Sequence, residues 1–173
     1  LEVEDMNVKD YSKIAREFFV RFNFKGVDVE KMQQIYDLAT SISEETGNVI
    51  DFDGKDVDAD GHDELVLLTN DSNISGYNKS INIVEWNAST GFQIGNYFET
   101  CENGTSIHTE DFNGDGKKDI AVVSIPDAKV CLHIFNKITG GLLPMQNLSL
   151  ESSVTHVDFG DLNHDGYFDI ISI

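Results

Sequence analysis

Three short stretches of the chain place acidic or amide side chains at every second position. They begin at Asp56, Asp111 and Asp161 and read DVDADGHDEL, DFNGDGKKDI and DLNHDGYFDI. All three fit the pattern D-x-[DN]-x-D-G-x-x-[DE]-[LI], and their starts are separated by roughly 50 residues, a spacing that predicts stacked supersecondary units. We name them loop 1 (56–64), loop 2 (111–119) and loop 3 (161–169), and count the residues of each loop as positions one to nine.

The spacing within each loop suits a hard cation with oxygen ligands. Oxygens at positions one, three and five of a tightly curled loop converge on one point, and glycine at position six permits the sharp turn. Position seven can offer its main-chain carbonyl, and position nine closes the shell with a carboxylate. Six or seven oxygen ligands favour Ca²⁺ over Mg²⁺, which requires a strict octahedron, and the scarcity of Cys and His at these positions disfavours zinc.

An EF-hand shares the first half of this pattern but not the second. Its loop requires a bidentate Glu at position twelve and a helix after the loop. Here position twelve is occupied by Leu67, Val122 and Ser172, and each loop is succeeded by a β-branched apolar run. The loops are therefore predicted to join β-strands.

With strands on both sides of each loop, the repeated pattern resembles the FG-GAP/VCBS repeats of integrin-α-like β-propellers. The resemblance covers about residues 49–173. It implies four-stranded blades, with a calcium loop between the first and second strands of each blade, and up to three Ca²⁺ ions. The side-chain ligands that it implies are Asp56, Asp58, Asp60 and Glu64, then Asp111, Asn113, Asp115 and Asp119, then Asp161, Asn163, Asp165 and Asp169, together with the main-chain carbonyls of His62, Lys117 and Tyr167.

The segments between the loops carry the periodicity and turn signals of β-strands. In VCLHIF (130–135), apolar residues occupy both alternating registers, which predicts a sheet covered on both faces. Because a half-blade leaves an unpaired edge, we expect the propeller to be completed by further sequence or by another chain. The predicted fold is mainly β, a partial β-propeller of about two and a half four-stranded antiparallel blades. The strands are predicted over 64–70, 80–86, 92–99 and 106–111, and then over 119–125, 129–136, 142–150 and 153–159.

Residues 1–48 show a helical periodicity instead. Apolar residues recur at intervals of three and four from Ile14 and again from Met32. We therefore predict two domains, an N-terminal α-helical hairpin over 1–48 and the propeller blades over 49–173. The hairpin either packs on the propeller or forms a free helix pair that binds a partner.

The composition limits the classes of partner. Acidic residues outnumber basic ones 31 to 12, which gives a formal net charge of −19. This charge disfavours nucleic acid and anionic membranes as partners and leaves metal cations as the leading counter-ions. Hydrophobic residues make up 40% of the chain, which argues against a disordered acidic tail. No run of about 18 apolar residues is present, so membrane insertion of this segment is not predicted.

Cysteines and sequons bear on the cellular compartment. Cys101 and Cys131 either form one disulfide or remain two buried thiols. Six Asn-x-Ser/Thr sequons favour a secreted or luminal glycoprotein, such as the ectodomain of a membrane protein, whereas in a protein that is never exported they would be polar turns. The sequons begin at Asn70, Asn73, Asn78, Asn87, Asn103 and Asn147.

The sequence contains no obvious catalytic constellation, so we expect the protein not to be an enzyme. Its histidines are scattered, and it has neither a nucleophile elbow nor a phosphate-binding glycine loop. The resemblance implies a calcium-stabilised module for protein binding or cell adhesion, with a protein ligand or a partner subunit. It also implies that ligands meet the end of the blades opposite the calcium loops, around 102–106. The alternatives are a carbohydrate-binding or polysaccharide-acting protein with a propeller domain, and a calcium buffer or sensor.

Overall fold

The computed structural model of the chain describes residues 48–59, 61, 63–70, 79–87, 91–136, 141–151 and 154–173. The chain divides into two compact units, Leu1–Glu45 and Thr46–Ile173. The predicted helical hairpin lies outside the described residues. All regular elements of the described residues are strands, and these residues contain no helix that is long and apolar enough to cross a bilayer.

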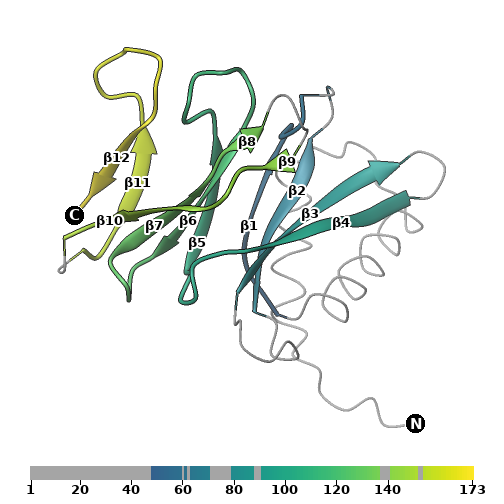
Figure 1. Ribbon diagram of the computed structural model, residues 1–173, viewed down its shortest axis with the longest axis horizontal. Helices are drawn as coiled ribbons and strands as arrows, with labels where there is room; N and C mark the ends of the chain where they lie inside the picture. Colours follow the sequence, from purple (N-terminus) through teal and green to yellow (C-terminus); the bar gives the residue numbers. More distant parts are fainter. Residues whose placement is uncertain are drawn as a thin grey trace, which may run out of the picture. The chain divides into compact units, whose positions relative to one another are not determined.

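The described part of the second unit begins with a four-stranded antiparallel sheet. Its strands lie in chain order, so each strand pairs with the one before it and the one after it (Figure 1). The strand that enters loop 1 and the three strands after the loop build this sheet. They are β1 (Asn48–Lys55), β2 (Glu64–Asn70), β3 (Ser80–Asn87) and β4 (Gly91–Glu99).

A second four-stranded antiparallel sheet repeats this arrangement with one interruption. It consists of β5 (Ser106–Glu110), β6 (Asp119–Ser124), β7 (Lys129–His133) and β10 (Gln146–Ser149). The interruption is a short hairpin between β7 and β10, formed by β8 (Phe135–Asn136) and β9 (Gly141–Leu142). A third repeat begins with an antiparallel pair, β11 (Val157–Gly160) and β12 (Asp169–Ser172).

Two of the predicted strands are interrupted, and the strand predicted over 153–159 begins only at Val157. The strand predicted over 129–136 is broken at Ile134, because the Phe135 main-chain N–H bonds to the Asp119 carboxylate at 2.8 Å. The strand predicted over 142–150 is split between Leu142, in β9, and Gln146–Ser149, which form β10, because Pro144 between them has no N–H to donate to a sheet. The first of these differences places β8 against the end of loop 2.

The second sheet is a layer with apolar side chains on both faces. β6 is buried along its whole length. In β7, Cys131 belongs to a hydrophobic cluster with Val66 and Leu68 of β2, whereas its neighbour Val130 belongs to another cluster that includes Phe159 of β11. Because successive side chains of a strand point to opposite faces, the sheet lies between β2 and β11 (Figure 1). The prediction that this strand is covered on both faces is confirmed.

Two carboxylates of β1 close the edge of the second sheet. β5 is an edge strand of that sheet, so alternate main-chain N–H groups lack a partner within it. Asp51 accepts the N–H of Ile107 at 2.9 Å, and Asp53 accepts the N–H of Thr109 at 3.0 Å and its hydroxyl at 2.6 Å. These bonds fix the first sheet against the second.

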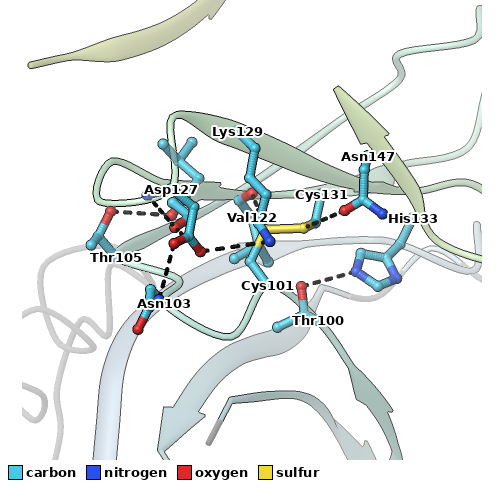
Figure 2. Close-up of a disulfide and its surroundings, with 12 residues drawn as sticks. Thr100, Cys101, Asn103, Thr105, Val122, Asp127, Lys129, Cys131, His133 and Asn147 are labelled. Atoms are coloured by element: carbon cyan, nitrogen blue, oxygen red, sulfur yellow. Dashed lines mark hydrogen bonds and ion pairs between the residues drawn. A yellow bond between two sulfur atoms is a disulfide. The ribbon is translucent and has the colours of Figure 1, made fainter. Parts of the chain in front are cut away.

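A disulfide joins Cys101 to Cys131 and answers the question that the sequence left open (Figure 2). It ties the connection between β4 and β5 to strand β7, and both cysteines are buried. The Cys101 sulfur lies 3.6 Å from the carbonyl oxygen of Val122, and the Cys131 sulfur lies 3.2 Å from Oδ1 of Asn147. The bridge therefore fixes the passage from the first sheet into the second.

Replacing both cysteines by alanine is expected to reduce the free energy of unfolding by roughly 2–4 kcal/mol, because the bridge closes a long loop in the unfolded chain. The sequence separation of the two cysteines is 30 residues. Urea denaturation followed by circular dichroism measures the loss. Asn147→Ala, which removes only the surface contact to the sulfur, serves as the control and is expected to cost little. A loss from the double variant no larger than that of the control would contradict a structural role for the bridge.

Candidate metal centre

Each acidic loop joins the first two strands of its repeat. Loop 1 connects β1 to β2, loop 2 connects β5 to β6, and loop 3 connects β11 to β12. Position nine of each loop is also the first residue of the next strand. Of the predicted ligands of each loop, the last, at position nine, is therefore carried by a β-strand.

The three loops share their main-chain conformation at positions four and six. Positions four and six have positive φ angles in every loop, which curls the chain twice within five residues. A positive φ is adopted at least cost by glycine, which explains why position six is glycine in all three loops. The angles at position four are 64° for Ala59, 74° for Gly114 and 60° for His164, and those at position six are 95° for Gly61, 87° for Gly116 and 91° for Gly166.

The loops also share their hydrogen bonds. The N–H of position two donates to the carboxylate of position nine, and the N–H of position six donates to the carboxylate of position one. Both bonds turn a carboxylate towards the interior of the curl. The first bond measures 2.8 Å for Val57–Glu64, 3.1 Å for Phe112–Asp119 and 3.0 Å for Leu162–Asp169, and the second measures 3.0 Å for Gly61–Asp56, 2.9 Å for Gly116–Asp111 and 3.0 Å for Gly166–Asp161.

In loop 2 the central positions are held by further bonds. The Asp115 N–H donates to Asp111 at 3.0 Å and to Oδ1 of Asn113 at 2.8 Å, and the Lys117 N–H donates to Asp115 at 2.9 Å. Loop 3 repeats these bonds with nearly the same distances, from Asp165 to Asp161 and Asn163 and from Tyr167 to Asp165. These bonds bring the side chains of positions one, three and five together in loops 2 and 3.

Loop 1 brings its carboxylates into a tight group. Oxygens of Asp56, Asp58 and Glu64 all lie within 4.8 Å of one another, and Glu64 is buried. Among the described residues, no other group of three Asp, Glu, His or Cys side chains brings its ligand atoms within 4.8 Å of one another. The predicted ligands Asp60 and His62 lie outside the described residues. Carboxylate oxygens at this separation fit a hard divalent cation such as Ca²⁺.

Loop 2 holds a buried carboxylate that resists ionisation. Burial raises the pKa of Asp119 to about 6. The N–H of Phe135 opposes the shift, and the neighbouring carboxylates of Asp115 and Asp111 add to it. The ionised Asp119 carboxylate is therefore unfavourable without a counter-ion, and a bound cation would stabilise it. The contact from Phe135 was not predicted, because the loop pattern contains no signal for a residue so far along the chain.

A family model for the FG-GAP-like repeat matches residues 56–122 and 111–172. Both matches begin at position one of a loop, and together they cover more than half of the chain. The chain belongs to the FG-GAP-like repeat family. The resemblance inferred from the loop pattern is thereby confirmed. No curated protein and no solved structure matches the chain.

The FG-GAP-like loops contain the donor set of an oxygen-ligated cation. At the described ligand positions one, three, five, seven and nine, the candidate donors are carboxylates, Asn amides and main-chain carbonyls, and the one described imidazole of the loops, that of His164, stands at position four. Ca²⁺ accepts such a set in flexible geometry, and its charge would offset the repulsion among the carboxylates. The chemistry that the ion would supply is therefore the stabilisation of the curled loop and of the strands that enter and leave it.

Calcium is expected to raise the melting temperature of the chain, and Asp115→Ala to reduce this gain by removing a ligand oxygen. At a calcium concentration 100 times its Kd, one site adds about 2.7 kcal/mol to the free energy of unfolding. Thermal melts in calcium and in chelator measure the difference. Lys118→Ala is the control, because its ammonium bonds Glu110 at 3.1 Å outside the ligand set. Equal losses of the calcium effect in the two variants would contradict the assigned positions.

The stability of the metal-free protein is expected to decrease as the pH rises through about 6. The folded-state pKa of Asp119 lies above the value of 3.8 for an unperturbed Asp. Between pH 3.8 and about 6, Asp119 is protonated in the folded state and ionised in the unfolded state. The free energy of unfolding therefore decreases as the pH rises through this range, and it reaches its lowest contribution from Asp119 above about pH 6.

Bound calcium is expected to remove this cost at neutral pH, so the calcium-induced rise in melting temperature should grow from pH 5 to pH 7.5. Melts across this range in calcium-free and calcium-containing buffer test the expectation. Asp119→Asn is the matched control and should flatten the dependence. Parallel pH profiles with and without calcium would contradict it.

Proposed function

We propose that the chain is a calcium-stabilised β-propeller module that binds a protein partner outside the cell or in the lumen of the secretory pathway. The observation that carries this proposal is the structural similarity of the three loops. They share positive φ angles at positions four and six, and in each the N–H of position six donates to the carboxylate of position one. Three copies of one curled acidic loop, each between the first two strands of a repeat, support a common ligand of the calcium type.

The propeller arrangement is supported by the way in which the sheets pack. The second sheet is covered by apolar neighbours on both faces, as a blade of a propeller is. The third repeat starts a further sheet but leaves Leu162 at 66% and Ile170 at 36% exposed. More four-stranded sheets, from further sequence or from another chain, would cover such side chains.

An oxidising compartment is supported by the disulfide and by two of the sequons. Disulfides persist in secreted and luminal proteins and are rare in the cytosol. Asn103 and Asn147 are exposed and begin sequons, and both lie near the bridge (Figure 2). An exposed side-chain amide in a sequon is the substrate of N-glycosylation.

The end of the sheets opposite the metal loops is the proposed binding surface. The β4–β5 connection and the β6–β7 turn lie at this end, because successive strands alternate in direction. Asn103 of the first donates to Asp127 of the second at 3.1 Å, so the two connections form one surface (Figure 2). Hydrogen bonds from Asn103 and Ser124 lower the pKa of Asp127, whose negative charge is partly offset by the Lys129 ammonium at 3.6 Å. Exposed Glu102 adds a second negative charge to the surface. A protein partner with basic residues suits this surface.

Adhesion of cells to the immobilised chain tests the proposed function. We expect attachment at about 1 mM Ca²⁺, which covers the affinity range of extracellular calcium modules, and reversible loss of attachment in chelator. Glu102→Lys should reduce attachment without lowering the melting temperature. Asp63→Lys, the same charge reversal at position eight of loop 1, is the control at the other end and should leave attachment unchanged. A reversed pattern, with loss from Asp63→Lys and none from Glu102→Lys, would assign binding to the metal-loop end and overturn the proposal.

A further inference from the structure

The side chain at position seven of loop 2 reaches into loop 1. The ammonium of Lys117 donates a hydrogen bond to the main-chain carbonyl of Asp58, which is position three of loop 1. The same ammonium lies 4.7 Å from the centroid of the Phe135 ring, and Phe135 is buried. A lysine held between a carbonyl and an aromatic face has lost most of its rotamer freedom, so its position depends closely on its own main chain.

Position seven of loop 3 makes the equivalent contact with loop 2. A Cβ atom added to Gly114 would lie only 2.7 Å from Cε1 of Tyr167, so the tyrosine ring rests on the main chain at position four of loop 2. Lys117 and Tyr167 differ in chemistry, but each extends from position seven of its loop to position three or four of the preceding loop. The same contact therefore joins two successive pairs of loops.

The main chain at position seven is tied to a candidate metal ligand of its own loop. The N–H of Lys117 donates to Oδ1 of Asp115, and the N–H of Tyr167 donates to Oδ1 of Asp165, both at 2.9 Å. A continuous set of contacts thus runs from position five of one loop, through position seven, to the main chain of the preceding loop. A cation held through position five would fix the main chain from which the side chain at position seven extends.

We propose that the position-seven side chains couple the metal loops, so that Ca²⁺ in one loop strengthens the binding of Ca²⁺ in the preceding loop. This inference rests on the calcium function proposed above. Loading loop 2 fixes Lys117, which then holds loop 1 in its curled form before an ion enters it. The ordering that loop 1 would otherwise undergo on binding is already complete, and this is a source of positive coupling between two sites.

Two electrostatic effects act against this coupling and are separable from it. Two bound cations repel each other, and the Lys117 ammonium repels a cation in loop 1. The second effect is present whether loop 2 is loaded or empty. A double-mutant cycle therefore isolates the coupling, because it compares the effect of disabling loop 2 with and without the Lys117 side chain.

Three glycine amides provide a separate reporter for each loop. The N–H groups of Gly61, Gly116 and Gly166 each bond to the first carboxylate of their own loop, so their NMR signals should respond to an ion in that loop. Ca²⁺ is titrated into the whole chain, and the midpoint for Gly61 is compared between the parent chain and Asp111→Asn, which disables loop 2. We expect Asp111→Asn to raise this midpoint about fivefold, at the lower end of typical coupling between sites.

In a Lys117→Met background, the same Asp111→Asn substitution should no longer raise the Gly61 midpoint, because only the repulsion between the two cations then remains and its loss favours binding in loop 1. Lys118→Met is the matched control, because the Lys118 ammonium bonds Glu110 and not loop 1, so the fivefold effect should persist there. Should Lys117→Met fail to fold, Tyr167→Ser with Asp161→Asn provides the same cycle for loops 3 and 2, with Gly116 as the reporter.

An unchanged Gly61 midpoint on disabling loop 2, or an effect that survives Lys117→Met, would overturn the coupling while leaving calcium binding intact. Failure of Ca²⁺ to move any of the three glycine signals would overturn the proposed calcium function together with the coupling.

Discussion

Repulsion among carboxylates within nine residues is the constraint on which each repeat is built. Main-chain N–H groups at positions two and six turn the carboxylates of positions nine and one inward, which orients the oxygens but leaves their negative charges together. Position nine is also the first residue of the second strand, so one contact sets both the curl of the loop and the start of the sheet. A cation at the centre would offset the charge without altering this geometry.

The layers of the fold are joined by contacts that differ from one junction to the next, although the loops are alike. Between the first and second sheets, Asp51 and Asp53 accept N–H groups from the edge strand β5. Between the second sheet and β11, aromatic contacts take their place, with Phe159 lying 4.9 Å from His108 and 5.2 Å from Phe112 between ring centroids. The hydrogen bonds that repeat are therefore those within the loops. The contacts between neighbouring sheets can differ as long as they bury the facing side chains.

The two ends of the sheets are stabilised in different ways. At one end the loops are held by hydrogen bonds to their carboxylates, whose mutual repulsion a counter-ion would offset. At the other end the disulfide between Cys101 and Cys131 and the bond between Asn103 and Asp127 fix the connections covalently and by hydrogen bonding. Connections held in this way present a defined surface even where the side chains on them vary, which is the usual basis for placing a binding site on loops.

The sequence by itself determined the loops, the chemical type of ligand that they suit and the strands that flank them, because those properties act within a few residues. Oxygen donors at alternate positions and a glycine at position six curl the chain locally, and alternating apolar residues select strands. Only the tertiary structure decided which distant groups meet. The cysteines pair across 30 residues, and Asp51 reaches Ile107 across 56. Lys117 was predicted only as a carbonyl ligand, yet its side chain extends to loop 1, because the packing of one sheet against another is set by buried faces that no local pattern encodes.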